Sequence, residues 1–376
     1  MSADTIRNAL AGLLEDSDNE AAWNDVEEAV TGGDGAQVVR ELEMARVAHE
    51  RLRNWAVVAR LLEYEVVLDD EPAIVVAKQV ELGRIYHQEL MRDDLALPAY
   101  SRALEMRPDD AKLREVVGEI EFGRANVEAT VEQAMVEALD TDDTAIRVAM
   151  LLRAAEFTFR YGDKSPKSLA AAKDFVGQAL EHAPDRADAL LLAGLIYGRL
   201  EHWSDLADAL SQRAEVADNR LDKLAAAYQL ALVTRHKLRD DQRALNAHER
   251  LFELEPSSSV AVQFLVGSYS RQEDWDRLVG VYEAHLQAGG LSKEGELGIL
   301  VQLAMMNWRS RGAPNAAEPY FERVRKGDPA HAGMLQFFRE QCQETGDNGR
   351  LMTILTDAQR ALSSTEDKAK LAEEIA

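Results

Sequence analysis

The sequence contains a single cysteine, Cys342, among its 376 residues. No disulfide can therefore form within the chain, which is typical of a protein from a reducing compartment. One thiol with no histidine close to it in the sequence is also a poor basis for a zinc site or a thiol nucleophile. We expect Cys342 to be a half-buried structural residue, and we expect no metal and no other cofactor.

Long apolar runs and an excess of basic residues are missing as well. No apolar stretch reaches the roughly 18 to 20 residues that a membrane span needs, and residues 1–5 lack a basic and apolar leader. The formal net charge is −24, from 67 acidic and 43 basic residues. Phosphate backbones and anionic membranes repel such a chain. We predict a cytoplasmic protein, without nucleic acid or a membrane as its partner, and the composition is typical of a high-GC bacterium.

Motifs of catalysis are scarce. The eight histidines include no HExxH pair, and the glycine-rich stretch at 32–35 has no Gly-Lys-Ser/Thr after it, so it predicts a turn between helices. The acidic stretch at 140–143 lacks the spacing of a calcium loop. We expect no catalytic residue, no metal site and no enzyme activity.

The sequence does contain a repeat of long period. Four prolines follow similar helical endings, with separations of 76, 72 and 73 residues: Pro108, Pro184, Pro256 and Pro329. Three tryptophans, each with an arginine four residues before it, interleave with them: Trp55, Trp203 and Trp275. Because proline cannot continue a helix, the two series predict a doublet of helical hairpins about every 73 residues.

The segment 75–108 shows the contents of one hairpin. Apolar or small residues recur at helical spacing on both sides of a polar break at 91–94: Leu82, Gly83, Tyr86, Ala96, Tyr100 and Ala103. With Pro108 after them, these residues resemble the consensus of the tetratricopeptide repeat (TPR), with one extra residue between the helices. The tryptophan hairpins resemble it more loosely. The resemblance covers the chain from about residue 19 to its end.

This resemblance implies an all-α, right-handed α-solenoid of about ten antiparallel helical hairpins. We place the hairpins at 3–31, 36–67, 75–107, 110–140, 146–183, 188–218, 221–255, 259–288, 293–328 and 331–362. We expect one continuous solenoid over 1–376, with atypical capping helices at 1–35. The segment 365–376 is either a C-terminal cap or the first helix of a truncated repeat.

In such arrays the first helix of each hairpin lines a concave groove. One phase near the end of each first helix forms a ladder: Arg51, Gln88, Arg124, Arg160, Arg199, His236, Arg271 and Arg309. These cations either support the fold, at helix ends and in ion pairs, or form a basic stripe that binds the carboxylates of a peptide. Replacing Arg199 and Arg271 with alanine separates the two roles.

Apolar groove candidates lie next to the ladder in the middle hairpins. They are Leu191, Leu195, Tyr228, Leu232, Phe264, Met305 and Trp308. They are either core residues between helices or anchors for a bound peptide. The Lys and Asn pairs of the family's carboxylate clamp do not occur on the expected first helices. Our candidate partner-binding set is Arg124, Arg160, Arg199, His236, Arg271, Arg309, Tyr228, Phe264 and Trp308.

The function that the resemblance implies is a non-catalytic scaffold or adaptor that binds a protein or peptide in a superhelical groove. Two alternatives stay open. One is a regulator that senses a peptide, and the other is a structural subunit that associates with itself in a larger assembly for secretion, motility or polarity. Self-association would appear as a homo-oligomer whose size depends on concentration.

Overall fold

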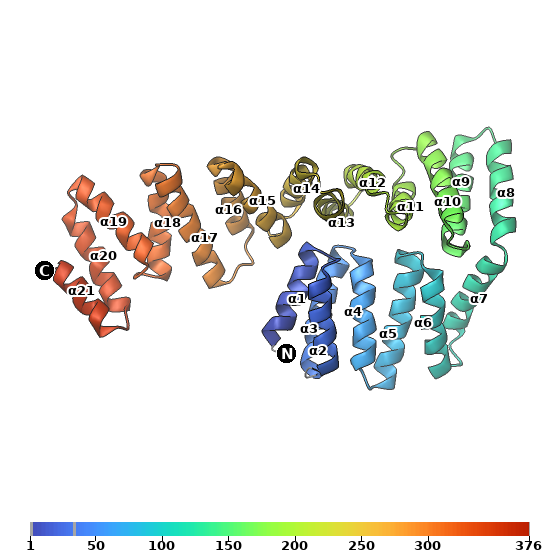
Figure 1. Cartoon of the computed structure of the whole chain (residues 1–376), viewed down its shortest axis with the longest axis horizontal. Coiled ribbons are helices and arrows are strands. Elements are labelled where there is room, and N and C mark those ends of the chain that lie inside the picture. The colour runs from blue at the N-terminus through green and yellow to red at the C-terminus, as the bar shows by residue number, and fades with distance from the viewer. Residues whose placement is uncertain (1–2, 33–34, 376) are drawn as a thin grey trace. The chain divides into compact units, whose positions relative to one another are not determined.

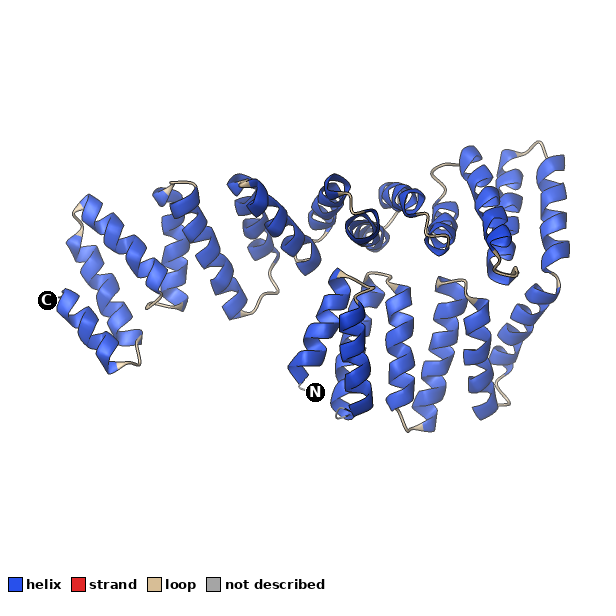
Figure 2. Ribbon diagram, viewed as in Figure 1, coloured by secondary structure: helices blue, strands red, loops and turns tan. Residues whose placement is uncertain are grey.

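A computed structural model describes residues 3–32 and 35–375, all of which are organised in helices and the turns between them. Figure 2 shows this helical architecture, and no strand occurs in the described part of the chain. Two residues of the glycine-rich turn predicted at 32–35 lie outside the described residues. The predicted end segments, 1–35 and 365–376, are described except for residues 1–2, 33–34 and 376. None of the described helices has both the length and the apolar character to cross a membrane.

The chain divides into two compact units, Met1–Leu254 and Glu255–Ala376, here called unit 1 and unit 2. Unit 1 comprises α1 (Ala3–Glu15), α2 (Glu20–Gly32), α3 (Gly35–Arg51), α4 (Trp55–Leu68), α5 (Pro72–Arg84), α6 (Asp93–Met106), α7 (Ala111–Ala125), α8 (Val127–Asp140), α9 (Thr144–Tyr161), α10 (Pro166–His182), α11 (Ala187–Arg199), α12 (Trp203–Val216), α13 (Arg220–Leu232) and α14 (Asp241–Leu254). Unit 2 comprises α15 (Ser259–Gln272), α16 (Trp275–Ala288), α17 (Lys293–Met305), α18 (Pro314–Gly327), α19 (Ala332–Thr345), α20 (Asn348–Ala361) and α21 (Thr365–Ile375). A single continuous solenoid over 1–376 stays a prediction.

The proline and tryptophan series mark helix boundaries as predicted. Each of the three tryptophans is the first residue of a second helix, in α4, α12 and α16. Each of the four prolines lies two residues after the end of a second helix, in α6, α10, α14 and α18. Side-chain caps define many helix starts. For example, the carboxylate of Asp110 accepts hydrogen bonds from the backbone N–H groups of Lys112 and Leu113.

The TPR-like hairpin α5–α6 packs as its sequence pattern implies. Leu82, Ala96, Tyr100 and Ala103 are all buried. A Cβ atom on Gly83 would lie 2.6 Å from the ring of Tyr100, so this position accepts no side chain without a shift of the ring. The small residue and the aromatic ring therefore determine how closely the two helices approach.

Nine of the ten predicted hairpins occur, with boundaries within a few residues, in the described part of the chain. The hairpin at 110–140 is wrong, because α7 and α8 hardly touch each other and α8 packs on α9 instead. Figure 1 shows α8 continuing beyond the end of α7 rather than folding back on it. Asn126 alone joins the two helices, and reversing a helical chain takes a loop of about 2–5 residues. The repeat register persists here, but the turn is too short to close the hairpin.

Three first helices end in a wider π-helical turn: η1 (Ile85–Glu89) after α5, η2 (Val233–Leu238) after α13 and η3 (Met306–Ser310) after α17. Buried polar side chains support two of these turns. The hydroxyl of Thr234 donates to the carbonyl of Leu230 at 2.7 Å, and the amide of Asn307 donates to the carbonyl of Leu303 at 2.8 Å. Each side chain gives a carbonyl a partner where the α-helical hydrogen-bond ladder changes.

Candidate functional site

Unit 1 folds back on itself, so that segments about 170 to 220 residues apart are joined by hydrogen bonds. The hydroxyl of Tyr228 donates to the carbonyl of Leu14 at 2.9 Å. The amide of Gln229 donates to the carbonyl of Arg53 at 3.1 Å. These bonds join α13 to the last turn of α1 and to the turn that follows α3. We call them, together with the bonds in the next paragraph, the closure contacts.

Charged side chains add to the closure contacts. Nε2 of His236 lies 2.8 Å from the carbonyl oxygen of Glu15. Lys237 pairs with Asp18 at 2.7 Å. In the first turn of α13, Asp222 pairs with Arg53 at 2.6 Å. The polar ends of α13 and η2 therefore match the acidic turn between α1 and α2 and the basic turn between α3 and α4.

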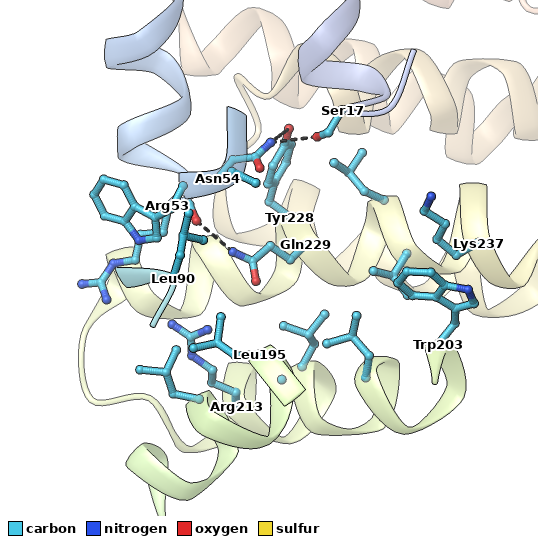
Figure 3. A pocket seen from close by; sticks show the side chains of 18 of the residues that line it. Ser17, Arg53, Asn54, Leu90, Leu195, Trp203, Arg213, Tyr228, Gln229 and Lys237 are labelled. Atoms are coloured by element: carbon cyan, nitrogen blue, oxygen red, sulfur yellow. Dashed lines mark hydrogen bonds between the residues drawn. The ribbon is translucent and has the colours of Figure 1, made fainter. Parts of the chain in front are cut away.

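A cavity of about 550 Å³, here called the closure pocket, lies between the closure contacts and α11–α12. Figure 3 shows side chains reaching it from several elements: Ser17, Arg53 and Asn54 from the two N-terminal turns, Leu195 from α11, and Trp203 and Arg213 from α12. Its apolar wall contains Leu190, Leu191, Leu195, Trp203, Leu206, Leu210, Leu232 and Val233. Gly194 lies in the same wall, where the absent side chain leaves room.

The polar part of the pocket wall is mostly satisfied by the protein itself. Burial raises the pKa of the Tyr228 phenol from 10.0 to about 12, so its hydroxyl stays a neutral donor to Leu14. Glu89 pairs with Arg84 at 2.9 Å, and Lys237 lies over the ring of Trp203, 5.1 Å from its centroid, while it pairs with Asp18. These groups therefore already have interaction partners within the protein.

Arg213 differs from the other polar groups. It is 9% exposed and reaches the pocket from the last turn of α12. Among the described residues, its guanidinium makes no side-chain hydrogen bond and no ion pair within 4.0 Å. Burial lowers the pKa of Arg213 below its ordinary value, Asp222 raises it and Arg53 lowers it further. An arginine stays charged in spite of such shifts.

The placement of Arg213 is costly for the fold. A cation in the last turn of a helix gains roughly 0.3 to 1 kcal/mol from the helix dipole. Burying an ion without a partner costs on the order of several kcal/mol. Because Arg213 lines the cavity and none of its nitrogens is among the described buried atoms without a partner, water or a ligand in the cavity can supply the acceptors that offset this cost.

Two of the nine predicted site residues reach the closure pocket, Tyr228 and His236. Three others, Arg160, Arg309 and Trp308, contact other helices of the chain itself. Arg160 donates to the carbonyl of His87 at 2.7 Å and lies 3.3 Å from the buried carboxylate of Asp93. Arg309 pairs with Glu340 at 2.9 Å and lies over the ring of Trp308. Trp308 is buried in unit 2, among aromatic residues of α18 and α19.

The remaining four lie elsewhere. Arg124, Arg199 and Arg271 are exposed, and Phe264 is half-buried. Burial and the neighbouring Arg92 lower the pKa of Arg199, and Asp94 raises it. Whether these residues contact a partner stays a prediction.

Sequence reasoning missed Arg213 because it searched the first helices only. A signal was present, since Leu206, Leu210 and Arg213 follow one another at helical spacing on one face of α12. A charge within an apolar stripe is an exception to the amphipathic pattern. The turn residues Arg53 and Asn54 could not be found in this way, because their place in the pocket depends on the return of the chain.

Together, the hairpins, their turns and their packing define the class of protein: a TPR-like stack of helical hairpins, as the sequence predicts. No group of three or more His, Cys, Asp or Glu side chains in the described ranges is arranged to hold a metal ion.

The solved structures with a remote likeness to this chain include the following two. The crystal structure of yeast Tom70 is 12% identical, and the match covers 99% of this chain and 94% of that one with a TM-score of 0.26. The crystal structure of the APC/C hetero-tetramer Cut9–Hcn1 is 10% identical, and the match covers 100% of this chain and 83% of that one, also with a TM-score of 0.26. No family model and no curated protein matches the chain. Because both TM-scores are low, the class rests on the chain's own helices and packing.

Proposed function

We propose that this chain is a non-catalytic scaffold that binds a segment of a partner protein along the inner surface of unit 1. The observation that supports this most is the closure pocket, whose leucines and tryptophan line a cavity that the chain's own side chains leave unfilled. Leu191 in its wall is 37% exposed. Apolar side chains of a partner gain free energy by filling such a space, at about 25 cal/mol per Å² of apolar surface that they bury.

A photo-crosslinking amino acid at position 191 tests the proposal. Expressed in the native cell, the labelled protein is expected to form a covalent adduct with one or a few partner proteins. The control is the same label at Leu221, which is 54% exposed and does not line the pocket. The adducts at 191 should disappear when Leu195→Glu is added. Identical adducts at both positions, or none at 191, would count against a binding surface in the pocket.

A self-associating subunit is the second candidate, favoured by the open α7–α8 segment. Phe122 in α7 is 68% exposed, and Val136 and Leu139 in α8 are 61% and 80% exposed. The two helices do not cover each other's apolar side chains, although α8 packs on α9. Light scattering over a range of concentrations separates the two candidates. A mass that rises with concentration, and returns to that of a monomer with Phe122→Ser and Leu139→Ser, supports self-association. A constant monomer mass supports the scaffold.

A further inference from the structure

The guanidinium of Arg213 is the one cation of the described pocket wall that is both buried and without an ion-pair partner. Arg53 is held by Asp222 at 2.6 Å, and Lys237 by Asp18 at 2.7 Å. Nδ1 of His236 lies 3.6 Å from Asp16. The negative charge of Asp222 raises the pKa of Arg213, but the ion pair that this carboxylate forms is with Arg53. Among the described residues, the guanidinium of Arg213 therefore lines the cavity with five N–H donors and has no ion-pair partner within 4.0 Å.

The surroundings of Arg213 restrict what could accept those hydrogen bonds. Leu195, Leu206 and Leu210 in the same wall favour an apolar body over a fully hydrated ion. The planar fork of a guanidinium matches the two oxygens of a carboxylate in a bidentate pair. A volume of about 550 Å³ is within the range of pockets that enclose small organic molecules.

The acidic residues of the wall limit the charge of the ligand. Asp16, Asp18, Glu89 and Glu201 also line the cavity. A headgroup with two negative charges, such as a phosphate monoester, would meet these carboxylates with only one unpaired cation to offset them. A single negative charge fits the site better.

We propose that the closure pocket binds an apolar molecule that carries one carboxylate, with the carboxylate on the guanidinium of Arg213 and the apolar part along Leu195, Leu206 and Trp203. With a free acid as the ligand, this site goes beyond the proposed scaffold function; with a chain terminus as the ligand, it rests on that function and names the group that the scaffold binds. The same chemistry has two sources, a free amphiphilic acid and the C-terminal carboxylate of an apolar peptide.

Direct titration of the full chain tests the site. The probes are decanoate, its neutral relative decanol, a short leucine-rich peptide with a free C-terminus and the same peptide as an amide, each followed by calorimetry and by tryptophan fluorescence. We expect saturable binding of at least one of the two carboxylates, with an affinity at least tenfold higher than that of its neutral counterpart. Binding of decanoate alone identifies a free acid as the source, and binding of the peptide acid alone identifies a chain terminus. Binding of neither carboxylate, or equal binding of the neutral probes, overturns the proposal.

Variants assign the effect to Arg213. Arg213→Met keeps most of the side-chain volume and should weaken carboxylate binding at least tenfold, whereas Arg124→Met, which removes an exposed arginine outside the pocket, should leave it unchanged. Gly194→Leu places a side chain in the cavity wall and should abolish binding of both carboxylates. Full binding by Arg213→Met overturns the proposal.

The thermal stability of the variant separates a ligand-binding role from a structural one. If Arg213 serves a ligand, Arg213→Met should unfold at a temperature equal to or higher than that of the unliganded wild-type protein, because an unpaired buried charge has been removed. It should also lose the rise in melting temperature that the carboxylate gives the wild type. A lowered melting temperature together with an unchanged response to the carboxylate overturns the assignment. Partner crosslinking at position 191 is independent of these readouts, so the failure of one proposal is distinguishable from the failure of the other.

Discussion

The close approach of α5 and α6 depends on one residue without a side chain, Gly83. The same device recurs at Gly123, where an added Cβ atom would lie 2.5 Å from the ring of Tyr161. There the ring comes from α9 rather than from α8, because α8 has moved away from α7. The glycine–tyrosine contact, here between Gly123 and Tyr161, is thus present even where the hairpin is open.

Gly83→Ala should lower the free energy of unfolding of unit 1, because the new methyl group meets the ring of Tyr100. We expect a loss of about 1 to 3 kcal/mol from overpacking, which exceeds the gain of roughly 1 kcal/mol from better helix propensity. Gly177→Ala in α10 is the matched control, because a Cβ atom there has no neighbour within 4 Å. It should stabilise the protein by roughly 1 kcal/mol in urea denaturation. Equal effects of the two changes would contradict the packing seen here.

His49 gives the stability of unit 1 a dependence on pH. It is fully buried, and burial lowers its pKa from 6.5 to about 4. The unfolded chain therefore binds a proton between pH 6.5 and 4 while the folded chain does not, so stability falls as the pH drops through this window. As the pH falls through this range, the free energy of unfolding of His49→Leu should decrease by up to about 3 kcal/mol less than that of the wild type. Chemical denaturation at several pH values measures this, and parallel curves for the two proteins would refute the role of His49.

At the scale of the element, most hairpin turns share one backbone conformation. A residue with positive φ lies between the two helices at Arg53, Met91, Lys164, Glu201, Arg239, Glu273, Gly312 and Gly346. Only glycine adopts this region without strain, and only the last two of these turns have it. The open α7–α8 joint lacks such a residue, since Asn126 has φ −116°. A residue with positive φ thus accompanies the reversal of the chain in these eight turns, although the α1–α2 turn reverses without one.

Glu273→Gly should stabilise unit 2, because φ is 55° at this position and glycine removes the strain of the side chain there. We expect a gain of roughly 0.5 to 1 kcal/mol, seen as a higher denaturation midpoint. Ala284→Gly, inside α16, should instead cost about 1 kcal/mol, since glycine is unfavourable within a helix. A loss of stability with Glu273→Gly would show that the carboxylate at this turn has a role that the backbone conformation does not explain.

The sequence determines these elements well because their signals are local. The tryptophans at the starts of α4, α12 and α16 and the prolines after α6, α10, α14 and α18 each report on a few neighbouring residues. The prediction failed at 110–140, where the periodicity of both helices is intact and only the length of the joint differs. A hydrophobic period reports which face of a helix is apolar, and it does not report what that face meets.

At the scale of the whole molecule, the closure of unit 1 could not be predicted. Tyr228 meets Leu14 and Gln229 meets Arg53 only after five hairpins and the open α7–α8 joint have set the path of the chain. No local sequence pattern reports where that path ends. The candidate site also depends partly on local signals and partly on the closure of unit 1. The repeat phase predicted Tyr228 and His236. Arg213, Arg53 and Asn54 line the pocket only because the chain returns to its N-terminal turns.

The distance between the start of α2 and the start of α14 tests the closure of unit 1 most directly. Spin labels at Glu20→Cys and Asp241→Cys, with Cys342 replaced by alanine, lie close in sequence to the Asp18–Lys237 ion pair without disturbing it. Electron paramagnetic resonance measurements of the distance between the two spin labels should give one short and narrow distribution. This distribution should broaden toward longer distances when Tyr228→Ala and Gln229→Ala are added. A broad distribution of long distances in the protein without these two changes would show that unit 1 is an open stack and has no closure pocket.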